Sequence, residues 1–341
     1  MLDAWRIARE LGRPIAVFWP DRVPGSYSLE SLFDLEAIAH SGLCDDLVFV
    51  TADYAKVRER FIRLMPVERT WRSKLRLLFA PASSRHIEII ASVHEPAHGR
   101  ATAEDEKIFA HQRELFHLLT PHPAIREALA AVLEWLPSSK FCAVHIRRGD
   151  VLRGFKRRLR RLQELRLHSQ ESPEDFFRRA HKEAEVDAWA TLLVRRVVSA
   201  AAYRAAIRAQ KKIRSILIFS DSPKTAVRFQ AKLSRSRVRL MESFPTELTT
   251  TQRAFFEILV LSRATTIVST GSNFSQVACR LGGAKFVDAR LYSKPSSVER
   301  LFNKNFGLML ETMPDVAEPC RRLLHETIEH ETRKLRAKHR A

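Results

Sequence analysis

The sequence has no apolar run that approaches the ~20 residues needed to span a bilayer. After Met1 it also lacks the basic and then apolar order of a secretory signal peptide. Its four cysteines, Cys44, Cys142, Cys279 and Cys320, are widely scattered, which fits neither a zinc site nor a disulfide framework. We therefore expect reduced, mostly buried thiols and a cytoplasmic protein, either free or peripheral to a membrane.

Acidic residues are scarce relative to basic ones. The 341 residues include 58 Lys and Arg against 39 Asp and Glu, which gives a formal net charge of +19. Such an excess predicts an anionic partner: nucleic acid, a phospholipid surface or a phosphorylated substrate. We expect no nucleic acid, because the aromatic residues are not interleaved with the basic runs as base stacking requires. The densest run, Arg153–Arg161, is either a solvated mobile loop or a basic lid that contacts an acidic acceptor or an anionic membrane.

The order of the predicted elements indicates an α/β protein. Beyond residue 215, short apolar strands alternate with helices, which implies βαβ units and a parallel sheet. Strands are predicted at 14–20, 46–51, 86–91, 141–146, 215–219, 238–241, 265–270 and 284–288. Helices are predicted at 2–11, 28–40, 102–119, 124–136, 172–209, 223–233, 251–262, 273–281 and 316–341. Residues 56–76 are basic and irregular in pattern, and Pro137–Ser139 marks the expected domain boundary.

The stretch Phe141–Asp150 predicts a ligand site at the end of a buried strand. Its apolar residues run into His145, Arg147, Arg148 and Asp150, and ligands of open α/β sheets bind at the carboxyl ends of strands. Adjacent strand side chains point in opposite directions, so one arginine can face a ligand while the other anchors the strand end. The planar guanidinium fork suits phosphate oxygens, which favours a diphosphate. The alternative is a pair of arginines on a solvated rim.

A second candidate turn, Ser220–Pro223, follows a predicted strand and opens a helix. Its Asp221 lies where a carboxylate can accept hydrogen bonds from a base or a ribose. The alternative is an ordinary helix cap formed by Asp221 or Ser222.

A third candidate turn, Thr270–Ser275, also joins a predicted strand to a helix. It offers a glycine, hydroxyl groups and backbone N–H groups at a helix start, which suit a phosphate. No Gly-Lys-Ser/Thr follows, so it is not a Walker loop. The alternative is a capped turn with Ser272 or Asn273 as the cap.

Three motifs occur in one order along the chain: His145–Asp150, Ser220–Pro223, and Phe256–Ala264 leading to Ser272–Val277. Together they resemble the GT-B fucosyltransferases, in particular the α1,6-fucosyltransferases, including the bacterial nodulation enzymes, and the O-fucosyltransferases. The resemblance is good over roughly residues 140 to 290 and extends weakly to the first 20. It implies a GT-B-like fold of two Rossmann-like α/β domains with parallel sheets.

The resemblance implies an acceptor-side domain over 1–138, a nucleotide-sugar-binding domain over 139–315 and a basic helix or tail over 316–341. The implied reaction is metal-independent, inverting transfer of fucose from GDP-fucose to a glycan or glycolipid, with no cofactor. The chain has no Asp-x-Asp motif.

The resemblance also assigns roles to residues of the three motifs. Arg147 and Arg148 are the implied catalytic residues, with Arg147 on the diphosphate. The implied donor-binding residues are His145, Asp150, Asp221, Ser222, Ser272, Asn273 and Ser275. The base that deprotonates the acceptor is not evident, and Asp150, Glu164 and Glu171 are candidates by position.

The sequence departs from the family pattern near its start. Relatives begin with a strand and a Gly-rich loop near the donor site, whereas this chain begins in the helix that follows them. We therefore expect an N-terminal domain that lacks its first strand. Glu257 also stands where relatives commonly carry Asp. These departures and the net charge leave an alternative open: a non-catalytic nucleotide- or polyanion-binding protein on a degraded glycosyltransferase fold.

Overall fold

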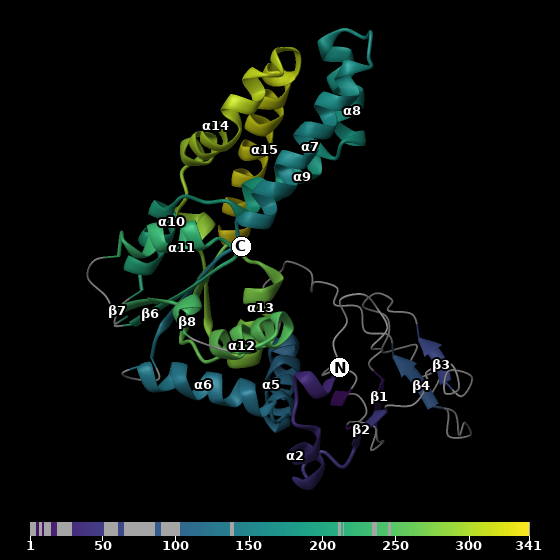
Figure 1. Cartoon of the computed structure of the whole chain (residues 1–341), viewed down its shortest axis with the longest axis vertical. Coiled ribbons are helices and arrows are strands. Elements are labelled where there is room, and N and C mark those ends of the chain that lie inside the picture. The colour runs from purple at the N-terminus through teal and green to yellow at the C-terminus, as the bar shows by residue number, and fades with distance from the viewer. Residues whose placement is uncertain are drawn as a thin grey trace. The chain divides into compact units, whose positions relative to one another are not determined.

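The computed structural model divides into two compact units, Met1–Glu127 with Glu247–Phe255, and Ala128–Thr246 with Phe256–Ala341 (Figure 1). The residues that it describes are 5, 6, 9, 15–18, 29–50, 61–64, 86–89, 103–136, 140–210, 213, 215–233, 237–244 and 247–340.

The first unit contains two pairs of parallel strands. Strand β1 (Ile15–Phe18) pairs with β2 (Leu47–Val50), and β3 (Phe61–Leu64) pairs with β4 (His86–Ile89). Strands β1, β2 and β4 confirm predictions from the sequence. Strand β3 corrects one, because it lies in the stretch that the sequence pattern indicated as irregular.

The helices of the first unit surround a small aromatic cluster. The predicted helix over 28–40 is wrong in part, because the structure has a 3-10 turn, Leu29–Ser31, and then α2, Leu35–His40. The side chain of Asp34 caps α2 by accepting from the N–H of Ala37. Phe33 packs edge-on against Phe255, with the two ring centroids 5.0 Å apart. Helices α5 (Ala103–Leu118) and α6 (Pro123–Trp135) follow as predicted, and the boundary between the two units falls within α6.

The second unit is built on a five-stranded parallel sheet in the order β7-β6-β5-β8-β9. The α/β fold class and the parallel sheet predicted from the sequence are therefore confirmed. The strands are β5 (Cys142–Ile146), β6 (Ser215–Ser220), β7 (Arg237–Leu240), β8 (Thr266–Ser269) and β9 (Lys285–Asp288). The helices that connect them near the sheet are α10 (Ala200–Arg208), α11 (Pro223–Gln230), α12 (Thr250–Ser262) and α13 (Asn273–Gly282).

The side chains of the central strands are buried on both faces of the sheet. Cys142, Val144 and Ile146 of β5 join a core with α10 and α11, which lie together in Figure 1. Ala143 and His145 project to the opposite face of β5, because the side-chain period of a strand is two residues. All five residues of β5 are buried, as expected of a central parallel strand.

The strand order reverses direction between β5 and β8. The chain runs outward from β5 through β6 to β7, and then returns to the other side of β5 to add β8 and β9. This topological switch point is where doubly wound folds bind ligands, at the carboxyl ends of the strands. Two of the three candidate turns, those after β5 and β8, flank it directly. The third follows β6, the other neighbour of β5.

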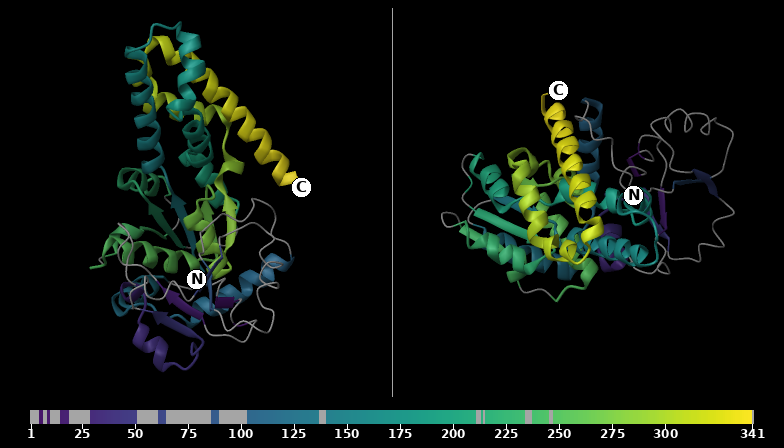
Figure 2. Two further views of the ribbon diagram at one scale, coloured as in Figure 1. Left: turned by 90° about the vertical axis from the view of Figure 1, so that its right-hand side faces the viewer. Right: turned by 90° about the horizontal axis from the view of Figure 1, so that it is seen from above.

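A helical bundle forms the rest of the second unit and has its own apolar core (Figures 1 and 2). It begins directly after β5 and resumes after β9, so its helices leave from the carboxyl edge of the sheet. Its members are α7 (Gly149–Leu167), α8 (Pro173–Glu183), α9 (Val186–Arg196), α14 (Pro295–Glu311) and α15 (Pro314–Arg340). The single helix predicted over 172–209 is therefore three helices, and the C-terminal helix begins two residues earlier than predicted.

The basic run Arg153–Arg161 is part of α7, which overturns its interpretation as a loop or lid. Phe155 and Leu159 are fully buried in the bundle core, while Arg157 and Arg160 lie on the exposed side of the helix. The apolar residues thus recur every third or fourth position between the charges, and their burial holds the segment as a helix.

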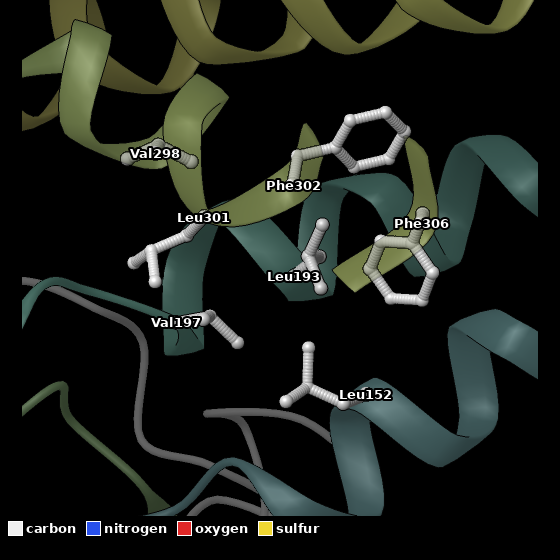
Figure 3. A pocket seen from close by; sticks show the side chains of 7 residues that line it. All are labelled: Leu152, Leu193, Val197, Val298, Leu301, Phe302 and Phe306. Atoms are coloured by element: carbon white, nitrogen blue, oxygen red, sulfur yellow. The ribbon is translucent and has the colours of Figure 1, made fainter. Parts of the chain in front are cut away.

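Apolar side chains from α7, α9 and α14 surround a small hollow in the bundle, seen close by in Figure 3. Phe302 and Phe306 of α14 face Leu193 and Leu152 across it. The hollow has no room for a water molecule, so it is a packing defect of the bundle rather than a ligand site.

The four cysteines are free thiols, and all but Cys279 are buried, as the sequence predicts. Burial raises the pKa of Cys142 to about 12, which keeps that thiol protonated. None of the described helices is both long and apolar enough to cross a membrane.

Candidate functional site

A chain of buried hydrogen bonds links the ends of β5 and β8. Nδ1 of His145 and Oγ of Ser272 share a hydrogen bond of 3.0 Å. Oγ of Ser272 lies 3.0 Å from Oγ of Ser275, and Ser275 donates to Oγ of Ser269 at 3.0 Å. The ring of Phe274 covers the imidazole, with the ring centroids 5.3 Å apart. The two strand ends at the switch point are therefore held together by side chains.

His145 is neutral at ordinary pH. Burial lowers the pKa of its imidazole from 6.5 to about 4, and the nearby charges of Arg147 and Arg196 act in the same direction. A neutral imidazole both donates and accepts hydrogen bonds without adding charge. The positive potential at this strand end therefore comes from the arginines.

Arg147 ends on the same face of β5 as His145 and forms an ion pair with Asp150. Its Nη2 and Nε donate to Oδ2 of Asp150 at 2.6 and 2.8 Å. The two side chains are 45% and 39% exposed. Burial acts to raise the pKa of Asp150, but the hydrogen bond and charge of Arg147 outweigh it and hold that pKa below its ordinary value. Exposed pairs of this kind contribute little, typically up to ~1 kcal/mol, so Arg147 can exchange its partner at low cost.

Asp221, after β6, caps the helix that follows β5. One carboxylate oxygen accepts from the N–H of Arg148 at 2.8 Å, and the other accepts from the N–H of Asp150 at 3.1 Å. The residue at the N-cap position of α7, Arg148, makes no side-chain cap bond of its own. A methyl group on Gly149 would lie 3.0 Å from the carbonyl oxygen of Asp221, so glycine permits the close approach.

We predict that Asp221→Ala lowers the free energy of unfolding by about 1–2 kcal/mol, because two N–H groups at the start of α7 lose their acceptor. Asp221→Asn should cost less than alanine, since its amide oxygen still accepts one of the two bonds. Urea unfolding monitored by circular dichroism measures both variants. An alanine variant as stable as the wild type would contradict the cap.

Arg148 turns to the opposite face of the sheet from Arg147. Its Nη2 donates to the carbonyl oxygen of Val198, just before α10. Burial lowers the pKa of its guanidinium from the ordinary value. Its Nε is buried and has no hydrogen-bond partner among the residues that the structure describes. Arg148 thus anchors the strand end, and Arg147 is the arginine that faces the switch point.

The N-terminus of α13 lies on the β8 side of the switch point. Oγ of Ser272 caps it by accepting from the N–H of Ser275, and Gly271 enters the turn with a φ of 75°. Within the described part of the chain, the N–H groups of Asn273 and Phe274 have no hydrogen-bond partner. Free N–H groups at a helix start form a site for an anion.

The structure gathers most of the predicted residues into two groups. His145, Ser272 and Ser275 form one, and the other consists of Arg147, Arg148, Asp150 and Asp221. The two groups adjoin at the end of β5.

Within the part of the chain that the structure describes, two predicted residues make no side-chain hydrogen bond to either group. Asn273 is exposed in the first turn of α13. Ser222 stands at the start of α11, where its hydroxyl pairs with that of Thr225 at 3.0 Å.

Of the three positional candidates for a base, only Asp150 stays near the strand end. Helix α7 carries Glu164 roughly 21 Å along its axis from Asp150, at about 1.5 Å per residue. Glu171 lies beyond the far end of α7 and pairs with Arg179 at 3.1 Å.

Sequence reasoning missed three residues that support the site. Tyr203 is fully buried and donates to the carbonyl oxygen of His145 at 3.3 Å, and burial raises its pKa to about 12. Arg196 donates to the carbonyl oxygen of Thr270 at 3.4 Å. Phe274 covers His145. Phe274 belongs to a motif that the sequence singles out, but nothing local marks the other two, because both come from helices remote in sequence.

The second unit is a doubly wound α/β domain with paired arginines and a serine-rich helix start at its switch point, a class of fold that binds nucleotides there. No protein-family model matches the chain, and no curated protein sequence matches it.

Among solved structures, the chain is similar to the fucosyltransferase NodZ from Bradyrhizobium, with 17% identity over 81% of this chain and 86% of that chain and a TM-score of 0.44. A second structure, of NodZ α-1,6-fucosyltransferase soaked with GDP-fucose, is 18% identical over 82% and 86%, with a TM-score of 0.43. POFUT1 in complex with GDP-fucose is 13% identical over 84% and 92%, with a TM-score of 0.44. Both proteins are GT-B fucosyltransferases, the family that the sequence motifs resemble. The values describe a distant likeness of fold.

Proposed function

We propose that the chain is a glycosyltransferase that uses a nucleoside-diphosphate sugar, GDP-fucose by the resemblance of its motifs, and transfers fucose with inversion and without a metal to a glycan or glycolipid acceptor. One observation carries the proposal: Arg147 and the free N-terminus of α13 lie on the two sides of the switch point in the sheet. Both are donors to anionic oxygens, and a diphosphate has oxygens for both.

Arg147 is the proposed catalytic residue. As the sugar–phosphate bond breaks, negative charge develops on the departing diphosphate, and a fixed guanidinium stabilises that state more than the ground state. Its half-exposed pair with Asp150 lets the diphosphate take over the guanidinium. Arg148 supports this arrangement by fixing the backbone through Val198. Of Asp150, Glu164 and Glu171, Asp150 lies nearest to the end of β5. Once Arg147 has released it, Asp150 is the proposed base that accepts the proton of the acceptor hydroxyl.

The remaining residues position the site. Neutral His145 forms a hydrogen bond with Ser272 and so fixes the start of α13 beside the end of β5. Asp221 is committed to the backbone of α7, so its proposed contact with the guanine or ribose would use lone pairs that the two N–H groups leave free. Ser275 donates hydrogen bonds to Ser269 and to the carbonyl oxygen of Ser272, and so supports the start of α13 from within the protein.

A thermal-shift titration with GDP, UDP and ADP tests the donor site. We expect GDP to raise the melting temperature of the wild type, and Arg147→Ala to weaken GDP binding at least tenfold, about 1.4 kcal/mol. Arg160→Ala is the matched control, because it removes an exposed arginine further along α7. Equal weakening by both variants, or no shift with any nucleotide, would refute the assignment of Arg147.

A second candidate function is non-catalytic binding of polyanions, which the net charge of +19 and the exposed arginines of α7 favour. Incubation with GDP-fucose and a mixture of glycans separates the two functions, since only a transferase releases GDP. A strong shift with heparin, together with no GDP release and no GDP binding, would establish the second function in place of the first.

A further inference from the structure

A basic pocket lies on the face of the sheet opposite to Arg147. It has a volume of about 320 Å³, roughly ten times the ~30 Å³ share of a water molecule. It opens between α10, α11 and α14, and the end of β5 forms its base. All of these elements belong to the second unit.

Five cationic side chains line this pocket: Arg148, Arg204, Arg228, Lys232 and Lys304. No Asp or Glu is among the residues that line it. The four other than Arg148 form no ion pair with any residue that the structure describes. Like charges gathered around a cavity repel one another, and an anion within it turns that repulsion into attraction.

Neutral donors add to the charges. Ser199 and Ala200, at the N-terminus of α10, line the pocket, and so does Thr225 of α11. Arg148 reaches the pocket from the base. A helix start, a hydroxyl and a guanidinium are donors suited to phosphate oxygens.

Apolar side chains complete the lining. Ile146 of β5 and the buried Phe229 of α11 line the pocket, and Leu301 lines both this pocket and the hollow in Figure 3. Apolar side chains in the lining can contact the carbon skeleton of an organic molecule, whereas a bare ion has no such skeleton. The lining therefore favours an organic ligand. The enclosed base around Arg148 is also reached by a small ligand more readily than by a flat membrane surface or a duplex.

We propose that this pocket is a second anion-binding site, separate from the one at Arg147, and that it takes a small phosphorylated organic compound. Arg228 of α11 and Lys232, in the turn just beyond the end of that helix, hold the phosphate from the open side, and Arg148 holds it from the base. Because Arg148 also gives its backbone N–H to Asp221, a ligand here contacts the same turn that carries Arg147. The occupied pocket would thus stabilise the turn after β5.

Calorimetric titration with pyrophosphate at 0.15 M salt tests this site in an Arg147→Ala background, which weakens the first anion site and so reduces its share of the measured binding. We expect Arg147→Ala to bind pyrophosphate, and the further substitutions Arg228→Ala and Lys232→Ala to weaken that binding at least tenfold. The matched control adds Arg208→Ala and Lys224→Ala, which remove two exposed charges from α10 and α11 outside the pocket.

Retained binding in the control, together with loss in the pocket variant, supports the site whether or not GDP binds at Arg147. Equal losses in both would show a general effect of net charge and overturn the proposal. Failure of Arg147→Ala to bind pyrophosphate would overturn it as well. Binding of vesicles rich in anionic phospholipid without binding of pyrophosphate would assign the basic surface to a membrane and also refute a small-molecule pocket.

Discussion

Replacing Gly282 with alanine is expected to lower the free energy of unfolding by about 3 kcal/mol or more, because the new methyl group has no space. A Cβ at this position would lie 1.7 Å from the carbonyl oxygen of Ser262 and 2.5 Å from its carbonyl carbon. The obstacle is backbone at the end of α12, so no change of rotamer relieves it. Either α13 or the end of α12 must move.

Gly307→Ala provides the matched control. Gly307 lies within α14, and a Cβ there meets nothing within 4 Å. Alanine at an open helical position should raise the free energy of unfolding by about 0.5–1 kcal/mol. The two substitutions should therefore change stability in opposite directions in urea unfolding at one pH. A Gly282→Ala variant within ~0.5 kcal/mol of the wild type would contradict the close approach of α12 and α13.

This contact has a consequence for the site. Helix α13 ends at Gly282 and begins at the cap that bonds His145. A displacement forced at one end of a ten-residue helix is carried to the other, because the helix moves as a rigid body. We therefore expect a folded fraction of Gly282→Ala to bind GDP more weakly than Gly307→Ala does.

The central strands of the second unit could be predicted from the sequence because each is a short, mostly apolar run between turn residues. Ser215–Ser220 and Thr266–Ser269 are buried on both sides, so their pattern depends little on the rest of the fold. Helix α7 could not be placed in the same way. Its arginines dominate its composition and led to the interpretation as a loop or lid, although Val151, Phe155 and Leu159 recur at helical spacing. The division between α8 and α9 depends on Glu185, which adopts a φ of 54° without being a glycine.

The candidate site was predictable as a set of strand-end turns, but the bonds within it were not. Parallel strands bring their carboxyl ends to one edge, so the turns after β5, β6 and β8 had to lie near one another. Which groups pair is decided by tertiary structure. Asp221 caps a helix 73 residues away, and Tyr203 donates to a carbonyl 58 residues away. The opposite directions of Arg147 and Arg148 follow from strand geometry alone. The pocket at Arg148 does not, because it also needs α14.

Stability should fall as the pH decreases from about 6.5 to about 4, with His145 as one main cause. Its pKa is lowered from 6.5 to about 4 in the folded state, chiefly by burial and then by the charges of Arg147 and Arg196. Above pH 6.5 the imidazole is neutral in both the folded and the unfolded chain, and its contribution is fully present. Below that pH the unfolded chain takes up a proton that the folded chain refuses, so unfolding becomes easier. The contribution of His145 to the free energy of unfolding therefore falls by roughly 3 kcal/mol between pH 6.5 and pH 4.

His145→Asn isolates this contribution, because its amide can keep the bond to Ser272 and does not titrate. Lowering the pH should therefore destabilise the variant less than the wild type, even though carboxylates such as Asp150 titrate in both proteins. His168→Asn, at an exposed histidine after α7, is the matched control and should follow the wild type. Urea unfolding of the three proteins between pH 4 and 8 gives the comparison. Parallel curves for His145→Asn and the wild type would mean that His145 is protonated as readily in the folded chain as in the unfolded one. That result would contradict a neutral imidazole between β5 and α13.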